Sequence, residues 1–176
     1  MEVVQSVVVL GPPPAELEEL IERRHRLGLD LYDEVWEGTY HMAPAPRFDH
    51  ANLAIALVRV LLPLTDAAGL VGGTPFNLGG PDNYRVPDLG WLRHPAHAVY
   101  VPTAALVVEV VSPDDETYDK LPFYAAHGVD EVMIVEGQER HVRIFSLAEG
   151  SYRETGHSDL LNIAAADLVT AVQWPA

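Results

Sequence analysis

The most hydrophobic run in the chain spans residues 104–111, and a single charged side chain, that of Glu109, interrupts it. A continuous apolar run that is rich in valine is typical of a central strand buried on both faces. A β-hairpin is predicted at 31–36 and 39–43, because the turn Glu37-Gly38 joins two strand-like runs. Further strands are predicted at 70–78, 84–92, 131–135 and 142–145, with a clear turn at 79–82.

Helical patterns surround these strands. Residues 15–27 place acids first and arginines last, which complements the dipole of a surface helix. A more apolar helix is predicted from Phe48 to about Ala68, and a third from Asp114 to His127, where Gly128 suits the left-handed C-terminal position. Residues 151–174 predict a short strand and a terminal helical turn. This order predicts an α/β fold with a mixed central sheet, and the length fits one domain over residues 1–176.

The charge balance limits the partners. A formal net charge of −15 repels polyanions, which argues against tight binding of nucleic acid. A bound divalent cation reverses the field locally, so the charge weakens binding more than it excludes chemistry on a phosphate. The chain has no cysteine, which excludes disulfides and thiolate metal sites. Any metal is therefore held by oxygen or imidazole ligands.

The apolar run at residues 3–10 is short, follows an acid and ends at a glycine and three prolines. These features differ from those of a signal peptide or a membrane span. We therefore expect a cytoplasmic protein with no membrane partner.

Two carboxylates, those of Asp88 and Glu109, lie in predicted strands, where a charged side chain is unfavourable. An ionised carboxylate in a buried strand is unfavourable unless it is paired or bound to a cation, so Glu109 requires a partner. An ion pair with Arg59 or Arg85 would satisfy it, and so would a metal or catalytic role. Asp88 follows Pro87, which lacks a ladder donor, and a strand start explains this aspartate as well as a function does.

Lys120 is the only lysine in a chain that has ten arginines, and it follows Glu109 by eleven positions. An ammonium is a compact point charge that arginine does not replace. The helix that carries Lys120 is predicted to start at Ser112-Pro113-Asp114-Asp115, and its side chains lean toward that end, so Lys120 can reach back toward Glu109. The alternative is an exposed i,i+4 pair with Glu116, which contributes only about 0.3–0.5 kcal/mol.

Taken together, Asp88, Glu109 and Lys120 resemble the PD-(D/E)xK nuclease superfamily, and within it the Uma-type family described as "putative restriction endonucleases". The resemblance covers roughly residues 30–145 and rests on Val86-Pro87-Asp88, on the string from Val108 to Pro113, and on Lys120 followed by Tyr124 and Gly128-Val129-Asp130-Glu131. The superfamily's usual lysine would fall at Val111, so that element is broken. In the Uma-type pattern a lysine in the following helix takes its place, and Lys120 matches it.

The resemblance implies a restriction-endonuclease-like fold and a homodimer that hydrolyses DNA phosphodiester bonds while binding DNA weakly. Mg²⁺ or Mn²⁺ would be held by Asp88, Glu109 and the carbonyl of Val110, with Lys120 positioning a water. His50 matches a histidine common in the family, which would orient a water or a phosphate; a half-exposed capping histidine explains it equally well. The alternatives are a scaffold protein that has lost its chemistry and a phosphohydrolase of small nucleotides. The pair His94 and His97 is expected in a surface loop.

Overall fold

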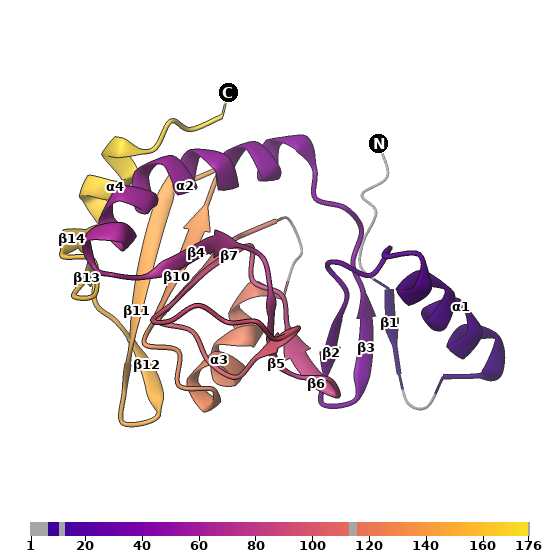
Figure 1. The fold of residues 1–176 in the computed structure, drawn as a ribbon. Helices are drawn as coiled ribbons and strands as arrows, with labels where there is room; N and C mark the ends of the chain where they lie inside the picture. Colours follow the sequence, from indigo (N-terminus) through magenta and orange to yellow (C-terminus); the bar gives the residue numbers. More distant parts are fainter. Residues whose placement is uncertain (1–6, 11–12, 113–115, 176) are drawn as a thin grey trace.

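The computed structural model describes residues 7–10, 13–112 and 116–175. Its strands form two six-stranded sheets and one small ribbon, with helices packed around them (Figure 1). The central sheet has the order β12-β11-β10-β9-β7-β4, and the N-terminal sheet has the order β1-β3-β2-β6-β5-β8. The predicted mixed sheet flanked by helices is present, although the strands are divided between two sheets.

The buried run predicted as a central strand forms β9, Leu106–Val110, and all five of its residues are buried. It pairs in parallel with β10 and antiparallel with β7, so the central sheet is mixed as predicted. The other strands of this sheet are β4 (Val71–Thr74), β7 (Leu89–Leu92), β10 (Glu131–Glu136), β11 (His141–Ala148) and β12 (Ser151–Glu154).

The predicted hairpin forms β2 (Glu34–Trp36) and β3 (Thr39–Met42) of the N-terminal sheet. The apolar run near the N-terminus was not predicted as a strand, yet part of it adds β1 (Val7–Val9) beside β3. The sheet is completed by β5 (Asn77–Gly80), β6 (Asn83–Arg85) and β8 (Tyr100–Val101). The ribbon consists of β13 (His157–Ser158) and β14 (Ile163–Ala164).

The prediction of two continuous strands at 70–78 and 84–92 was wrong, because each one divides between the two sheets. One antiparallel hairpin pairs β5 with β6 near its tip and β4 with β7 near its base. Both arms bend where a proline stands, at Pro75 and at Pro87. A proline has no N–H for a strand ladder and restricts the residue before it. The bend places Asp88 where the chain passes from the N-terminal sheet to the central sheet.

Two of the predicted helices are confirmed as α1 (Ala15–Arg26) and α2 (Phe48–Ala67), and α4 (Ala165–Ala171) is the predicted terminal turn. The predicted helix at 114–127 is shorter. A 3₁₀ turn, η1 (Thr117–Lys120), leads into α3 (Leu121–Ala126). Pro122 explains the break, since its missing N–H fits the first turn of a helix and not its interior. The predicted helix start at 112–115 falls largely outside the described residues.

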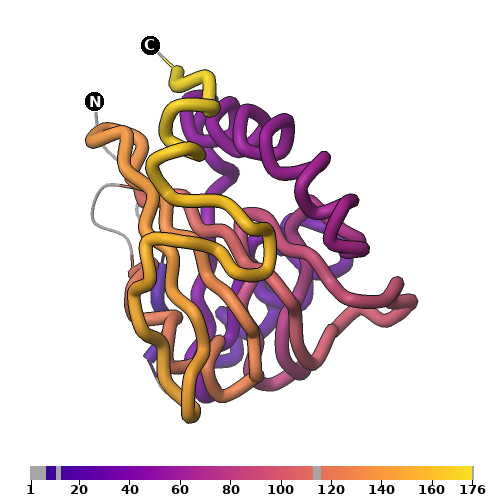
Figure 2. Tube along the Cα trace, turned by 90° about the vertical axis from the view of Figure 1, so that its left-hand side faces the viewer, coloured from indigo at the N-terminus to yellow at the C-terminus, as the bar shows by residue number. Residues whose placement is uncertain are grey.

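The central sheet is covered on both faces. Leu106, Val108 and Val110 of β9 face a core cluster shared with α2, whereas Val107 faces a second cluster shared with α3. The C-terminal segment lies beside α2 on the same side (Figure 2). Because strand side chains alternate, Glu109 points to the face of Val107 and α3.

By length and composition, α2 is the one helix among the described residues that is long and apolar enough to cross a membrane, with a mean hydropathy of 1.3. The core helix of a soluble protein passes the same test. Four residues of α2 belong to the buried core: Leu53, Ala56, Leu57 and Leu61. The absence of a membrane partner stays a prediction.

Candidate active site

Glu109 lies in a buried polar cluster between the central sheet and α3. Its Oε1 accepts a hydrogen bond from the hydroxyl of Tyr124 and lies 3.3 Å from Nζ of Lys120. Burial raises the pKa of Glu109 to about 7 against the opposing charge of Lys120, and the negative charges of Asp88 and Glu34 add to the rise. The Glu109 carboxylate therefore lies close to two other acids, Asp88 and Glu34, although the ammonium of Lys120 is beside it.

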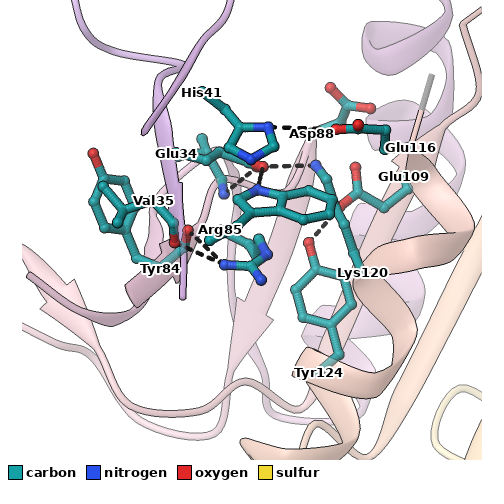
Figure 3. Close-up of polar contacts among 12 residues, drawn as sticks. Glu34, Val35, His41, Tyr84, Arg85, Asp88, Glu109, Glu116, Lys120 and Tyr124 are labelled. Carbon is teal, nitrogen blue, oxygen red and sulfur yellow. Dashed lines mark hydrogen bonds and ion pairs between the residues drawn. The ribbon is translucent and has the colours of Figure 1, made fainter. Parts of the chain in front are cut away.

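Lys120 reaches Glu109 as predicted, but from an unexpected place in the helix. It stands at the junction of η1 and α3, four residues before Tyr124, so both side chains leave the same helical face. The Nζ atom of Lys120 lies between two carboxylates, 2.9 Å from Glu34 and 3.3 Å from Glu109 (Figure 3). Burial alone would lower the pKa of Lys120, but the charges of Glu109 and Glu34 outweigh it and raise that pKa.

The alternative pairings suggested by the sequence are not found. Lys120 does not pair with Glu116, whose carboxylate lies 3.4 Å from Nδ1 of His41. Arg85 pairs with Glu37 instead of Glu109, and Arg59 is exposed on α2. The partner of Glu109 is thus Lys120, which the predicted helix geometry had placed within reach of it.

Glu34 of β2 is the site residue that sequence reasoning missed. It is buried, and its Oε1 accepts hydrogen bonds from Nζ of Lys120 and from the main-chain N–H of Val86 at 2.7 Å. Its Oε2 accepts a hydrogen bond of 2.6 Å from the indole of Trp36. An acid inside a predicted strand is the signal that singled out Glu109, and the same signal was present at Glu34.

Asp88 is held by contacts from two elements, α2 and β9. Its Oδ1 lies 2.9 Å from Nε2 of His50 on α2, and its Oδ2 accepts a 2.7 Å hydrogen bond from the N–H of Val110 on β9. Nδ1 of His50 lies 3.1 Å from the hydroxyl of Ser112. His50 is therefore not a half-exposed capping residue, because it connects the start of α2 to the Asp88 carboxylate.

Arg85 and several rings form a compact wall beside Glu34. The guanidinium of Arg85, which is 2% exposed, lies 4.2 Å from the ring of Trp36 and 4.1 Å from that of Phe123. Trp36 stacks on His41 at 4.6 Å, and Phe123 stacks on His127 at 3.9 Å. We call these five residues the stacked wall. Cation–π and stacking contacts of this kind fix the orientation of each plane.

The donor set of the site is suited to a hard divalent cation. Asp88 and Glu109 offer carboxylate oxygens, and their mutual repulsion would be relieved by an ion. The N–H of Val110 faces Asp88, and the N–H and C=O groups of one strand residue point to the same edge, so the Val110 carbonyl lies on that side too. Among the described residues, no group of three or more His, Asp or Glu side chains is arranged to hold a metal. A Mg²⁺ ion that keeps several waters does not require one.

The histidine pair His94 and His97 lies in an exposed segment between β7 and β8, as expected for a surface loop.

We expect Glu109 to make the metal-free protein lose stability as the pH rises from about 4.5 to about 7. In this window the folded state keeps a proton that the unfolded chain has already released, so unfolding releases a proton and becomes easier with rising pH. Glu109→Gln lacks this titration. In urea unfolding with EDTA, the free energy of unfolding of wild type, relative to that of the variant, should therefore decrease as the pH rises from about 4.5 to about 7. Parallel stability curves would show that the pKa of Glu109 is not raised.

The fold and the cluster together define a nuclease-like α/β protein, in which two acids and a lysine meet beside a mixed sheet. A family profile, Uma2, described as "Putative restriction endonuclease", matches residues 15–175, and the chain belongs to this family. The family assignment places the chain among the nucleases.

A similar fold is found in a crystal structure described as "a putative nuclease belonging to DUF820 from Anabaena variabilis ATCC 29413". The two align with a TM-score of 0.64 and 15% sequence identity, over 79% of this chain and 90% of the other. At this identity the likeness shows the fold alone, and it confirms the predicted restriction-endonuclease-like class. No curated protein matches the chain.

Proposed function

We propose that the protein is a divalent-metal-dependent endonuclease that hydrolyses phosphodiester bonds of DNA, with Mg²⁺ or Mn²⁺ as its cofactor. The observation that carries the proposal is the meeting of Asp88, Glu109 and Lys120, which come from three separate segments of the chain. Two acids near one another and one buried ammonium fit a cation and a phosphate better than they fit a hydrophobic core.

Asp88, Glu109 and the carbonyl of Val110 would hold the ion. When bound, the ion lowers the pKa of a water and neutralises charge on the scissile phosphate. His50 and the N–H of Val110 fix the two oxygens of Asp88, so this carboxylate is oriented before the ion arrives. Tyr124 does the same for Glu109 through its hydroxyl.

Lys120 supplies the positive charge next to the reacting phosphate. Its ammonium is held between carboxylates and stays protonated, because Glu109 and Glu34 raise its pKa. It therefore acts as an electrostatic and hydrogen-bonding group that orients the water and stabilises the charge that develops on the phosphate, and not as a general base.

The net charge of −15 favours a second candidate, the hydrolysis of small phosphorylated nucleotides, because a short anion meets less repulsion than a duplex. Within the first proposal the same charge makes DNA binding weak and sensitive to salt. We also propose that the enzyme is a cytoplasmic homodimer.

A cleavage assay tests the proposal. Purified wild type should nick supercoiled plasmid with Mg²⁺ or Mn²⁺ and not with EDTA. Asp88→Asn, purified in the same way, is the control for a contaminating nuclease. Asp130→Asn is the matched control for the loss of an acid, since Asp130 is partly exposed and pairs with Arg93. Cleavage of dinucleotides without cleavage of plasmid would favour the second candidate. No cleavage of DNA, RNA or dinucleotides would favour a scaffold protein.

A further inference from the structure

We propose that Glu34 is a positioning residue that fixes the ammonium of Lys120 beside Glu109 and couples it to the segment that carries Asp88. This proposal rests on the proposed function for its kinetic part, while its structural part can be tested without any cleavage. Neither the family assignment nor the sequence pattern assigns a role to this glutamate.

The contacts of Glu34 converge from three parts of the chain. Its Oε1 accepts hydrogen bonds from Lys120 at 2.9 Å and from the main chain of Val86 at 2.7 Å, and its Oε2 accepts one from Trp36 at 2.6 Å. A carboxylate with three donors, one of them charged, is strongly held. Both oxygens are engaged, so the carboxylate has a fixed orientation.

The place of Val86 gives these contacts a role beyond stability. Val86 stands two residues before Asp88, at the bend where the chain leaves the N-terminal sheet. One carboxylate therefore sets the position of the lysine relative to the segment that ends in Asp88. A lysine side chain has four rotatable bonds, and without such a contact it loses its fixed place.

The stacked wall orients Glu34 through the hydrogen bond from Trp36. Trp36, the donor to Oε2, lies between the ring of His41 and the guanidinium of Arg85. Its indole plane is therefore held on both faces, and its N–H points at Glu34 in a fixed direction. The buried Arg85 also donates to the carbonyl of Val35, which ties this wall to β2.

The two distances around Lys120 indicate why a second carboxylate is useful. Its Nζ lies closer to Glu34, at 2.9 Å, than to Glu109, at 3.3 Å. If Lys120 were paired with Glu109 alone, the lysine and a bound metal ion would compete for the same carboxylate. Either the lysine would lose its position, or Glu109 would be less available to the ion. With Glu34 as the stronger partner, Lys120 keeps its position while Glu109 remains available.

A double-mutant cycle in cleavage tests the kinetic part, with Glu34→Gln, Lys120→Met and the double variant at saturating Mn²⁺. We expect Glu34→Gln to lower kcat by about 10- to 50-fold, which is typical of residues that orient a catalytic group through a hydrogen bond. The KM and the Kd of Mn²⁺ should change by less than about threefold. In the Lys120→Met background the same change should have no further effect. An equal loss in both backgrounds would overturn the proposal, because Glu34 would then act independently of the lysine.

Two variants separate positioning from folding. Asp33→Asn is the matched control, because Asp33 is the neighbouring residue, is fully buried and pairs with Arg24 without contacting Lys120. It should lower the melting temperature and leave kcat within about twofold. Trp36→Phe keeps a ring in the stacked wall and removes only the N–H, so kcat should fall several-fold. An unchanged kcat in Glu34→Gln together with a loss in Asp33→Asn would contradict the proposal.

A spectroscopic measurement tests the structural part whether or not the protein cleaves DNA. Lys120 is the only lysine, so selective ¹³C-lysine labelling gives the signal of this one side chain. NMR relaxation of its Cε should show restricted motion in wild type and in Asp33→Asn, and free motion in Glu34→Gln. Restricted motion in Glu34→Gln would overturn the proposal. Failure of wild type to cleave, with the expected relaxation result, would reject the proposed function and leave the role of Glu34 standing.

Discussion

Asp88→Asn and Glu109→Gln should each abolish the binding of Mn²⁺ and lower DNA cleavage by about 10³-fold or more, the several kcal/mol that a metal ion supplies to phosphate hydrolysis. Each variant keeps the shape of the side chain and removes its charge. In Asp88→Asn the amide oxygen can still accept a hydrogen bond from the N–H of Val110, while the amide nitrogen faces His50, so the fold should persist.

Calorimetric titration of Mn²⁺ and a plasmid assay, run on the same preparations, measure both effects. Added Mn²⁺ should raise the melting temperature of wild type, because the ion binds the folded state. Asp130→Asn should behave as wild type, since that carboxylate is partly exposed and pairs with Arg93. Unchanged binding in both site variants would place the ion elsewhere on this acidic chain and reject the metal site.

Lys120→Arg should lose cleavage by about 10²-fold or more, nearly as much as Lys120→Ala, although the arginine keeps the charge. The ammonium sits in a buried space between Glu34 and Glu109, at 2.9 and 3.3 Å. A planar guanidinium is wider and would form two-pronged contacts with one of these acids. It would therefore misplace the positive charge relative to the phosphate.

Metal affinity separates this effect from a general disturbance of the site. An ammonium is not a metal ligand, so both lysine variants should bind Mn²⁺ with nearly the affinity of wild type. The titration is best done at a pH above the pKa of about 7 that Glu109 has in wild type, because Lys120 helps to keep Glu109 ionised and its loss raises the pKa of that acid. Full activity in Lys120→Arg would show that the lysine supplies charge alone.

The sequence predicted the parts of the fold that local patterns encode. The buried strand β9, the long helix α2 and the hairpin of β2 and β3 all follow from periodicity and turn residues. The nearness of Lys120 to Glu109 was also predicted, because the helix that follows a strand brings the two together. These features depend on residues that are near one another in the chain.

What the sequence did not predict depends on distant pairings. The segment 84–92 reads as one strand, because its apolar pattern does not reveal that Val86 donates to Glu34 instead of to a neighbouring strand. Pro87 was correctly noted as unfavourable in a central strand, yet only the structure shows that it directs the chain from one sheet to another. An ion pair of Arg85 with Glu109 was one alternative from the sequence, and Arg85 stacks between two rings instead. The homodimer and the cytoplasmic location stay predictions.

The contact between Glu34 and Lys120 joins residues 86 positions apart. Glu109 lies on β9, and β9 pairs with β10, which follows Lys120 in the chain. Contacts of such long range form late, after most of the chain is available. During synthesis, Glu34, Glu109 and Lys120 of the nascent chain are therefore not yet in contact. This ordering would delay the proposed nuclease activity until the polypeptide is nearly complete.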